Sequence, residues 1–224
     1  TNAADTVSFG PFTYGKPGTY TYTVKESGEV DGVTNDTESS KTVTVTVKDN
    51  GDGTLTATAD STTEAPLTFT NTYGVEPMTA SFPVKKVLTV PEGLKGPESW
   101  SYTIDVVAKN GAPEARTMTG TVSNETDTVT FGDFTYTAPG EYTYTVTETG
   151  TVAGVTNDSE ATTGKTVTVT VVDNGDGTLT ATADSTTAAP LTFTNTYSVG
   201  NLKITKTFAG VPEGADLSKL SFTI

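Results

Sequence analysis

Polar and apolar residues alternate with a period of two along much of this chain. The alternation is clearest over residues 142–148, 165–171 and 191–197, and it is typical of β-strands that bury one face. Turn-forming sequences such as Pro139-Gly140 and Asn174-Gly-Asp-Gly177 separate these stretches. The pattern therefore predicts about eight strands and no convincing helix over residues 76–198. This indicates an all-β sandwich with an immunoglobulin-like pattern.

Much of the sequence occurs twice, at a spacing of roughly 122 to 124 residues, the size of a domain. Thr6–Tyr14 matches Thr128–Tyr136, and Ala65–Tyr73 matches Ala189–Tyr197. The tyrosine-rich and valine-rich segments between them recur in the same order. The chain is thus predicted to contain tandem copies of one domain.

The repeat divides the chain into three segments. Residues 76–198 are predicted to be one complete β-sandwich repeat. Residues 1–75 match the C-terminal part of a preceding repeat, and residues 199–224 match the N-terminal strands of a following one. Because part of a sandwich exposes unpaired strand edges, we expect the chain to be a window on a longer polypeptide. The short junctions between segments predict a stiff rod.

A second interpretation makes the chain a subunit of a strand-complemented filament. The C-terminal segment carries front strands that the N-terminal segment lacks, so neighbouring chains could complete one another head to tail. Such a composite would still lack the equivalent of residues 105–122. The fragment interpretation is therefore preferred.

Three polar residues continue lines of alternate apolar side chains in their predicted strands: Lys86, Glu148 and Asn195. Burying any one of them alone would be costly. Polar residues recur at all three matched positions of the partial segments, so they form a pattern and not an isolated exception. These counterparts are Glu26, Asn71 and Lys206.

An amine, a carboxyl group and a carboxamide in a dry core can form an amide bond. Burial lowers the pKa of a lysine, which frees a neutral amine, and raises that of a glutamate, which keeps it protonated. The acid can polarise the carboxamide and move protons as ammonia leaves, and packing supplies the proximity. We predict a Lys86–Asn195 bond promoted by Glu148, with Glu26 as the matching catalytic group. The alternative is that the three are merely buried and hydrogen-bonded.

Several segments resemble the streptococcal pilin isopeptide-linkage domain, found in the T-antigen-type major pilin of group A streptococci and in Gram-positive surface proteins. They are Tyr142–Glu148, the valine-rich stretch from Lys165, Asp173–Gly177 and Phe193–Tyr197. The combination Tyr-x-Tyr-x-x-x-Glu with Phe-x-Asn-x-Tyr is specific, and the resemblance covers nearly the whole chain. It implies tandem immunoglobulin-like (CnaB-related) β-sandwiches.

The resemblance also implies an intramolecular isopeptide bond that maps onto Lys86, Asn195 and Glu148. Lys85 is the runner-up, because the family's first strand reads Lys-x-Leu/Phe-x-Gly and the complete repeat lacks that glycine. Alignment from the Pro-Glu-Gly motif selects Lys85, whereas face alternation selects Lys86 and is preferred. Within this sequence only Lys86 has both partners. Glu26 and Asn71 lack a matching lysine, and this sequence contains no residues at the positions that would match Glu148 and Asn195 for Lys206.

Composition excludes several kinds of function. A net charge of −14 and a pI near 4.2 argue against nucleic-acid binding. With no Cys and no His, disulfides and most transition-metal sites are ruled out. The acidic turns Asp49–Gly53 and Asp173–Gly177 lack the length and final Glu of a calcium loop and indicate hairpins. No metal, cofactor or membrane insertion is expected.

We expect a structural repeat of a bacterial cell-surface fibre, either a pilus shaft or an adhesin stalk, that is extracellular and attached to the cell wall. Its partners would be neighbouring repeats, with any host-surface ligand bound by another domain. It would not be an enzyme beyond the single bond-forming turnover. The alternatives are an adhesive or glycan-binding module that uses sandwich-end loops, and an accessory region of a carbohydrate-active enzyme. The likeness of the repeats favours the stalk, since nothing marks one of them as a binding head.

Overall fold

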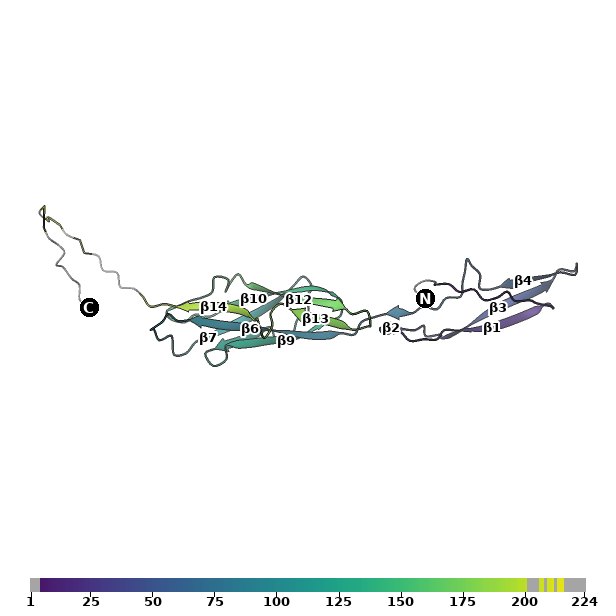
Figure 1. The fold of residues 1–224 in the computed structure, drawn as a ribbon, viewed down its shortest axis with the longest axis horizontal. Coiled ribbons are helices and arrows are strands. Elements are labelled where there is room, and N and C mark those ends of the chain that lie inside the picture. The colour runs from purple at the N-terminus through teal and green to yellow at the C-terminus, as the bar shows by residue number, and fades with distance from the viewer. Residues whose placement is uncertain (1–4, 201–205, 208, 212, 216–224) are drawn as a thin grey trace.

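The computed structural model describes residues 5–200, 206–207, 209–211 and 213–215. It is elongated, with two β units arranged end to end along the long axis (Figure 1). Every regular element in the described residues is a strand, which confirms the all-β prediction. The described part contains no apolar helix of membrane-spanning length. The predicted segment from residue 199 onward lies largely outside the described residues, although Lys206 is described and exposed.

The complete repeat forms two sheets, with strand orders β13-β12-β10-β7-β8 and β11-β14-β6-β9. The strands pair antiparallel, except that β6 and β14 run parallel. The repeat contains nine strands, where the sequence predicts about eight, and the ninth is the two-residue strand β11. The bounds are β6 Met78–Thr89, β7 Ser101–Lys109, β8 Thr119–Ser123, β9 Thr128–Tyr136, β10 Gly140–Thr149, β11 Val155–Thr156, β12 Lys165–Asp173, β13 Leu179–Ala183 and β14 Leu191–Tyr197.

The core between the two sheets is built from alternate side chains, as the sequence pattern predicts. Phe82 of β6 is fully buried and lies against three aromatic rings. Its ring centroid is 5.2 Å from that of Phe134, nearly parallel to it, 6.1 Å from Phe131 and 5.3 Å from Tyr144. The Tyr144 hydroxyl is satisfied by that of Tyr136 at 2.9 Å. Strand β6 therefore supplies the centre of the core.

The first unit reproduces part of this architecture. It contains a three-stranded sheet, β1-β3-β4, and a two-stranded pair, β2-β5. Its pairings repeat those of the complete unit, since Tyr20 faces Val45 as Tyr142 faces Val169. The bounds are β1 Gly18–Lys25, β2 Val33–Thr34, β3 Ser40–Asp49, β4 Leu55–Ala59 and β5 Thr72–Tyr73.

Nearly identical sequences adopt different structures in the two units. Residues 128–136 form β9 in the complete unit, whereas the matching residues 6–14 form no strand. Strand β9 pairs with β6, and residues 5–75 contain no counterpart of β6 among their strands. Phe9 and Phe12 consequently remain 67% and 52% exposed, while Phe131 and Phe134 are 2% and 0% exposed. Packing against β6 decides the structure of this segment.

Phe134→Ala should lower the free energy of unfolding of the complete repeat by about 3–5 kcal/mol, because it removes a fully buried ring. The matched change Phe12→Ala should cost its own unit less than about 1 kcal/mol, because that ring is half exposed. Chemical denaturation of the two variants measures both effects. Equal losses would contradict the assignment of these rings to core and surface.

Candidate functional site

Strand β6 turns Lys86 into the core. Phe82, Val84 and Lys86 are alternate residues on one face of the strand, and each is at most 1% exposed. Lys85 points to the other face, where its side chain is 40% exposed and pairs with Asp127 at 3.4 Å. The structure thus buries Lys86 and leaves Lys85 at the surface.

Strands β14 and β10 place the other two predicted residues beside Lys86. In the parallel pairing of β6 with β14, Phe193 lies opposite Lys86, and Asn195 lies opposite Leu88. Glu148 belongs to β10 in the facing sheet, so its side chain crosses the core to reach the pair. Both Glu148 and Asn195 are 0% exposed.

The Glu148 carboxyl group contacts both predicted reaction partners. Its Oε2 lies 3.1 Å from Lys86 Nζ, and its Oε1 accepts a hydrogen bond of 2.8 Å from Asn195 Nδ2. Lys86 Nζ also donates to the backbone oxygen of Phe193 at 3.1 Å. A single buried acid therefore bridges an amine and a carboxamide on neighbouring strands.

Burial determines the protonation of the amine. The pKa of Lys86 is lowered because burial removes the charged ammonium from water, and this outweighs the attraction of Glu148. The Tyr102 ring lies 5.0 Å from Lys86 Nζ and is itself buried, which helps to exclude water. The site therefore favours the neutral, nucleophilic form of the amine.

Asp158 and Lys165 form a second layer of this site, which was not predicted from the sequence. The backbone N–H of Asp158 donates to Asn195 Oδ1 at 2.7 Å, the position at which a donor stabilises negative charge on the carboxamide oxygen. The Asp158 carboxylate accepts from Lys165 Nζ and from the Thr194 N–H, both at 2.8 Å. These contacts hold the Asp158 backbone against Asn195.

The Asp158 carboxylate is held in its ionised form. Burial acts to raise the pKa of Asp158, but hydrogen bonds from Lys165 and from the backbone outweigh it, so the pKa is lowered. The recurrence of both residue types at Asp36 and Lys41 was the signal that could have revealed this layer. Among the described residues no group of three acidic, Cys or His side chains could hold a metal ion.

A comparison with known families identifies the family to which this chain belongs. The family described as the Spy0128-like isopeptide containing domain (FctA) matches residues 1–74 and 82–198. The chain belongs to this family. The match covers both β units and includes all three residues of the buried trio.

Solved structures similar to this family member include major pilins of Streptococcus pyogenes. The T-13 pilin is 19% identical, over 55% of this chain and 54% of its own, with a TM-score of 0.34. The T3.2 pilin is 19% identical over 82% and 68%, with a TM-score of 0.21. This chain spans about half the length of the T-13 pilin. The comparison with curated proteins finds no match.

The first Spy0128-like unit contains the same constellation without the amine. Asn71 Nδ2 donates to Glu26 Oε1 at 2.8 Å, and the Asp36 N–H donates to Asn71 Oδ1 at 2.9 Å. Lys41 pairs with Asp36 at 2.7 Å, as Lys165 does with Asp158. Glu26 Oε2 is shielded from solvent and has no hydrogen-bond partner in the described part of the chain. It matches the oxygen of Glu148 that contacts Lys86.

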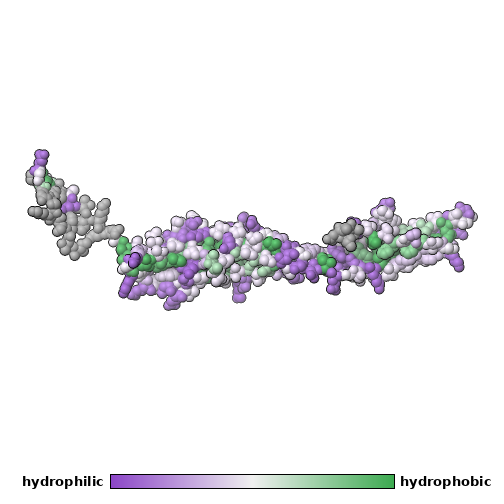
Figure 2. All heavy atoms as spheres, in the orientation of Figure 1, coloured by the Kyte–Doolittle hydropathy of each residue, from purple (hydrophilic) through white to green (hydrophobic). Residues whose placement is uncertain are grey.

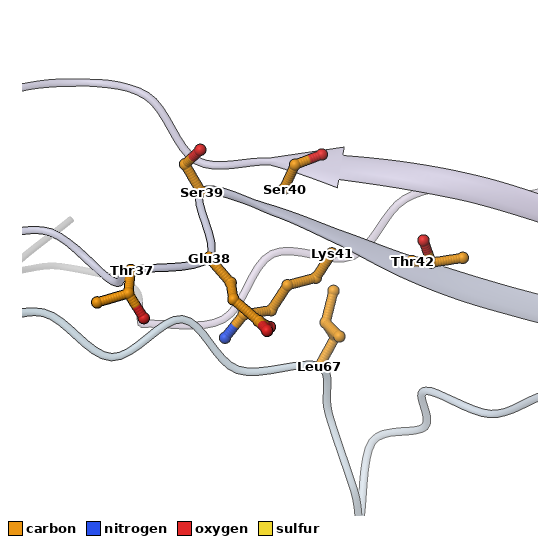
Figure 3. Close-up of a pocket in the computed structure, with 7 residues that line it drawn as sticks. All are labelled: Thr37, Glu38, Ser39, Ser40, Lys41, Thr42 and Leu67. Atoms are coloured by element: carbon orange, nitrogen blue, oxygen red, sulfur yellow. The ribbon is translucent and has the colours of Figure 1, made fainter.

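A groove of about 620 Å³ opens in this first unit between residues 37–42 and Leu67 (Figure 3). Leu67 matches Leu191, which lies opposite Val84 of β6 in the complete repeat. The groove therefore borders the path that a β6-like strand would take. Apolar side chains are visible on the surface of the same unit (Figure 2).

Substituting each neighbouring lysine tests which one reacts. We expect the unchanged chain to have lost one ammonia and Lys86→Met to have retained it, because the variant lacks the buried amine. Lys85→Met should still lose that ammonia, since Lys85 is exposed and faces away. Intact-mass measurement under denaturing conditions distinguishes the two. Ammonia loss in Lys86→Met would rule out Lys86 as the nucleophile.

Proposed function

We propose that this chain is a structural segment of a bacterial surface fibre, in which the complete repeat is locked by a Lys86–Asn195 isopeptide bond. The observation that carries the proposal is the buried Glu148 carboxyl group in contact with both the amine and the carboxamide. Membership of an isopeptide-containing family supports the bond. The pilin names of the similar structures support the fibre.

The reaction balances without any added reagent. The neutral Lys86 Nζ attacks Asn195 Cγ, and Glu148 donates a proton to the carboxamide as its C–N bond breaks. One Nζ–Cγ amide bond forms, one ammonia leaves, and the proton lost by Nζ returns to Glu148. The Asp158 N–H stabilises the charge that develops on Asn195 Oδ1. The cycle runs once for each domain.

The position of the bond suits a load-bearing role. Tension enters the repeat near Met78 in β6 and leaves near Tyr197 in β14, and these two strands are neighbours. A bond between Lys86 and Asn195 would pass that tension directly from one strand to the other. The sheets between the two residues would then carry little of it. Closing a loop of about 109 residues would also stabilise the fold by about 4–5 kcal/mol.

The remaining properties follow from this role. We place the chain outside the cell, at the surface and joined to the cell wall through the rest of the polypeptide. Its partners are neighbouring repeats of the same fibre, and a host ligand would be bound elsewhere. No turnover of an external substrate is proposed.

Pulling the chain by its ends tests the mechanical role. The unchanged chain should show no extension from residues 86–195, whereas Glu148→Gln, which cannot donate the proton, should lengthen by an additional roughly 350–400 Å on unfolding. Single-molecule force spectroscopy measures this difference.

The matched control is Glu26→Gln in the first unit, which should leave the complete repeat inextensible. Intact mass serves as the chemical check, with one ammonia retained only in Glu148→Gln. Full extension of the unchanged chain would refute the proposal.

A second function, strand complementation, is favoured by a specific observation. The pair Glu26 and Asn71 is assembled in the first unit, with one shielded carboxyl oxygen left without a hydrogen-bond partner in the described residues. Phe9 and Phe12 are exposed where their counterparts pack against Phe82. This unit is therefore complementary to a strand that carries an alternating apolar face and a lysine.

A synthetic peptide with the sequence of residues 78–89 tests strand complementation. We expect it to add to the chain with loss of one ammonia, because its lysine would reach Glu26 and Asn71. Asn71→Ala should abolish the adduct, and a peptide with Lys86→Arg should not react. The matched variant Asn195→Ala should keep the adduct. An adduct that survives Asn71→Ala would contradict this assignment.

A further inference from the structure

The turn between β12 and β13, Asp173–Gly177, lies where the two units meet (Figure 1). It contacts the end of the first unit, formed by Gly32, Tyr73 and Gly74. The Tyr73 hydroxyl donates to Asp173 Oδ1 at 2.6 Å and accepts from the Gly177 N–H at 3.2 Å. One tyrosine thus binds both ends of the turn.

The connecting segment adds a backbone bond to the same turn. The N–H of Glu76 donates to the Gly177 oxygen at 2.8 Å. The hydrogen bond to the Asp173 carboxylate raises the pKa of Tyr73, which keeps its hydroxyl protonated as a donor. Asp173 also accepts from the Gly175 N–H at 2.8 Å, so the same oxygen shapes the turn and binds the tyrosine.

Two glycines allow the backbones to approach closely. A Cβ atom built on Gly32 would lie 2.6 Å from the Gly177 Cα atom, and one built on Gly177 would collide with Gly32. Both residues have positive φ, +75° and +83°, which glycine adopts without strain. The contact therefore requires glycine on each side.

The chain contains a second copy of each half of this contact. The turn Asp49–Gly53 has the same internal hydrogen bonds as Asp173–Gly177, with Gly51 N–H donating to Asp49. Its Gly53 is exposed and has no atom within 4 Å of a built Cβ, whereas Gly177 is buried. At the far end of the complete repeat, Tyr197 lies against Gly154 as Tyr73 lies against Gly32. The two turns have the same conformation, and Gly177 differs from Gly53 only because it contacts the neighbouring unit.

We propose that the Asp-Asn-Gly-Asp-Gly turn is a docking element that fixes each repeat to the one before it, with Tyr73 as its anchor. The surface formed by Gly154 and Tyr197 would take the same turn from a following repeat. Two domains of one chain move relative to one another by default unless contacts between them restrain the motion. The hydrogen bonds of Tyr73 and Glu76 restrain that motion and make the junction stiff. This role does not depend on the isopeptide bond.

Distances between spin labels in the two units measure the stiffness of the junction. The chain has no cysteine, so Thr46→Cys and Thr170→Cys place labels at matched, exposed positions of β3 and β12. In the otherwise unchanged chain we expect a narrow distance distribution by pulsed electron resonance. Gly177→Ala and Tyr73→Phe should broaden it roughly twofold as the units move independently.

The repeats supply matched controls. Gly53→Ala introduces the same side chain at nearly the same φ, +84°, without touching the other unit, and should leave the width unchanged. Tyr197→Phe should also leave it unchanged, because Tyr197 lies at the opposite end of the complete repeat. If Gly177→Ala unfolds its domain, Tyr73→Phe still decides the question.

An unchanged width of the distance distribution in Tyr73→Phe, or equal broadening by Gly53→Ala, overturns the proposal. Ammonia loss in the same samples reports on the isopeptide bond separately.

Discussion

The parallel pairing of β6 with β14 is the interaction on which the rest of the structure depends. It joins the first strand of the complete repeat to the last, and so brings together residues more than a hundred positions apart. The same pairing places Lys86 and Asn195 on neighbouring strands, while the pairing of β6 with β9 sets Phe82 among the core aromatics. Glu148 then reaches this pair from the opposite sheet. A proposed covalent bond at this position would make permanent the contact that closes the fold.

The two copies of the repeat in one chain show what this strand contributes. The first unit builds the sheet β1-β3-β4 and the Glu26–Asn71 contact, so neither needs β6. It leaves Phe9 exposed and residues 6–14 without a strand. The acid and the carboxamide are therefore positioned without a lysine, so that the proposed reaction would need only the amine to be brought to them. The junction at Tyr73 adds a separate, non-covalent restraint between the units.

The burial of all three residues of the trio could be predicted because strand faces follow from a period of two. That rule places Lys86 inward and Lys85 outward, which is where the structure has them. Asp158 was missed because it lies in a loop, where no periodicity indicates direction, and it acts through its backbone N–H. The docking contact of the Asp173–Gly177 turn was missed for a similar reason. The turn's sequence predicts its own conformation but not the surface that it meets.

The sequence by itself determined which residues of each strand-forming segment share a face and where the turns lie, because these depend on side-chain alternation and on local hydrogen bonds. The hairpins β3-β4 and β12-β13 form with the same register in both units for that reason. Only the tertiary structure decided the fate of segments whose partners are distant. Residues 65–73 and 189–197 have identical sequences. Only two residues of the first segment form a strand, β5, whereas seven residues of the second form β14. A strand needs a neighbour for its backbone hydrogen bonds, and β6 supplies that neighbour in the complete repeat.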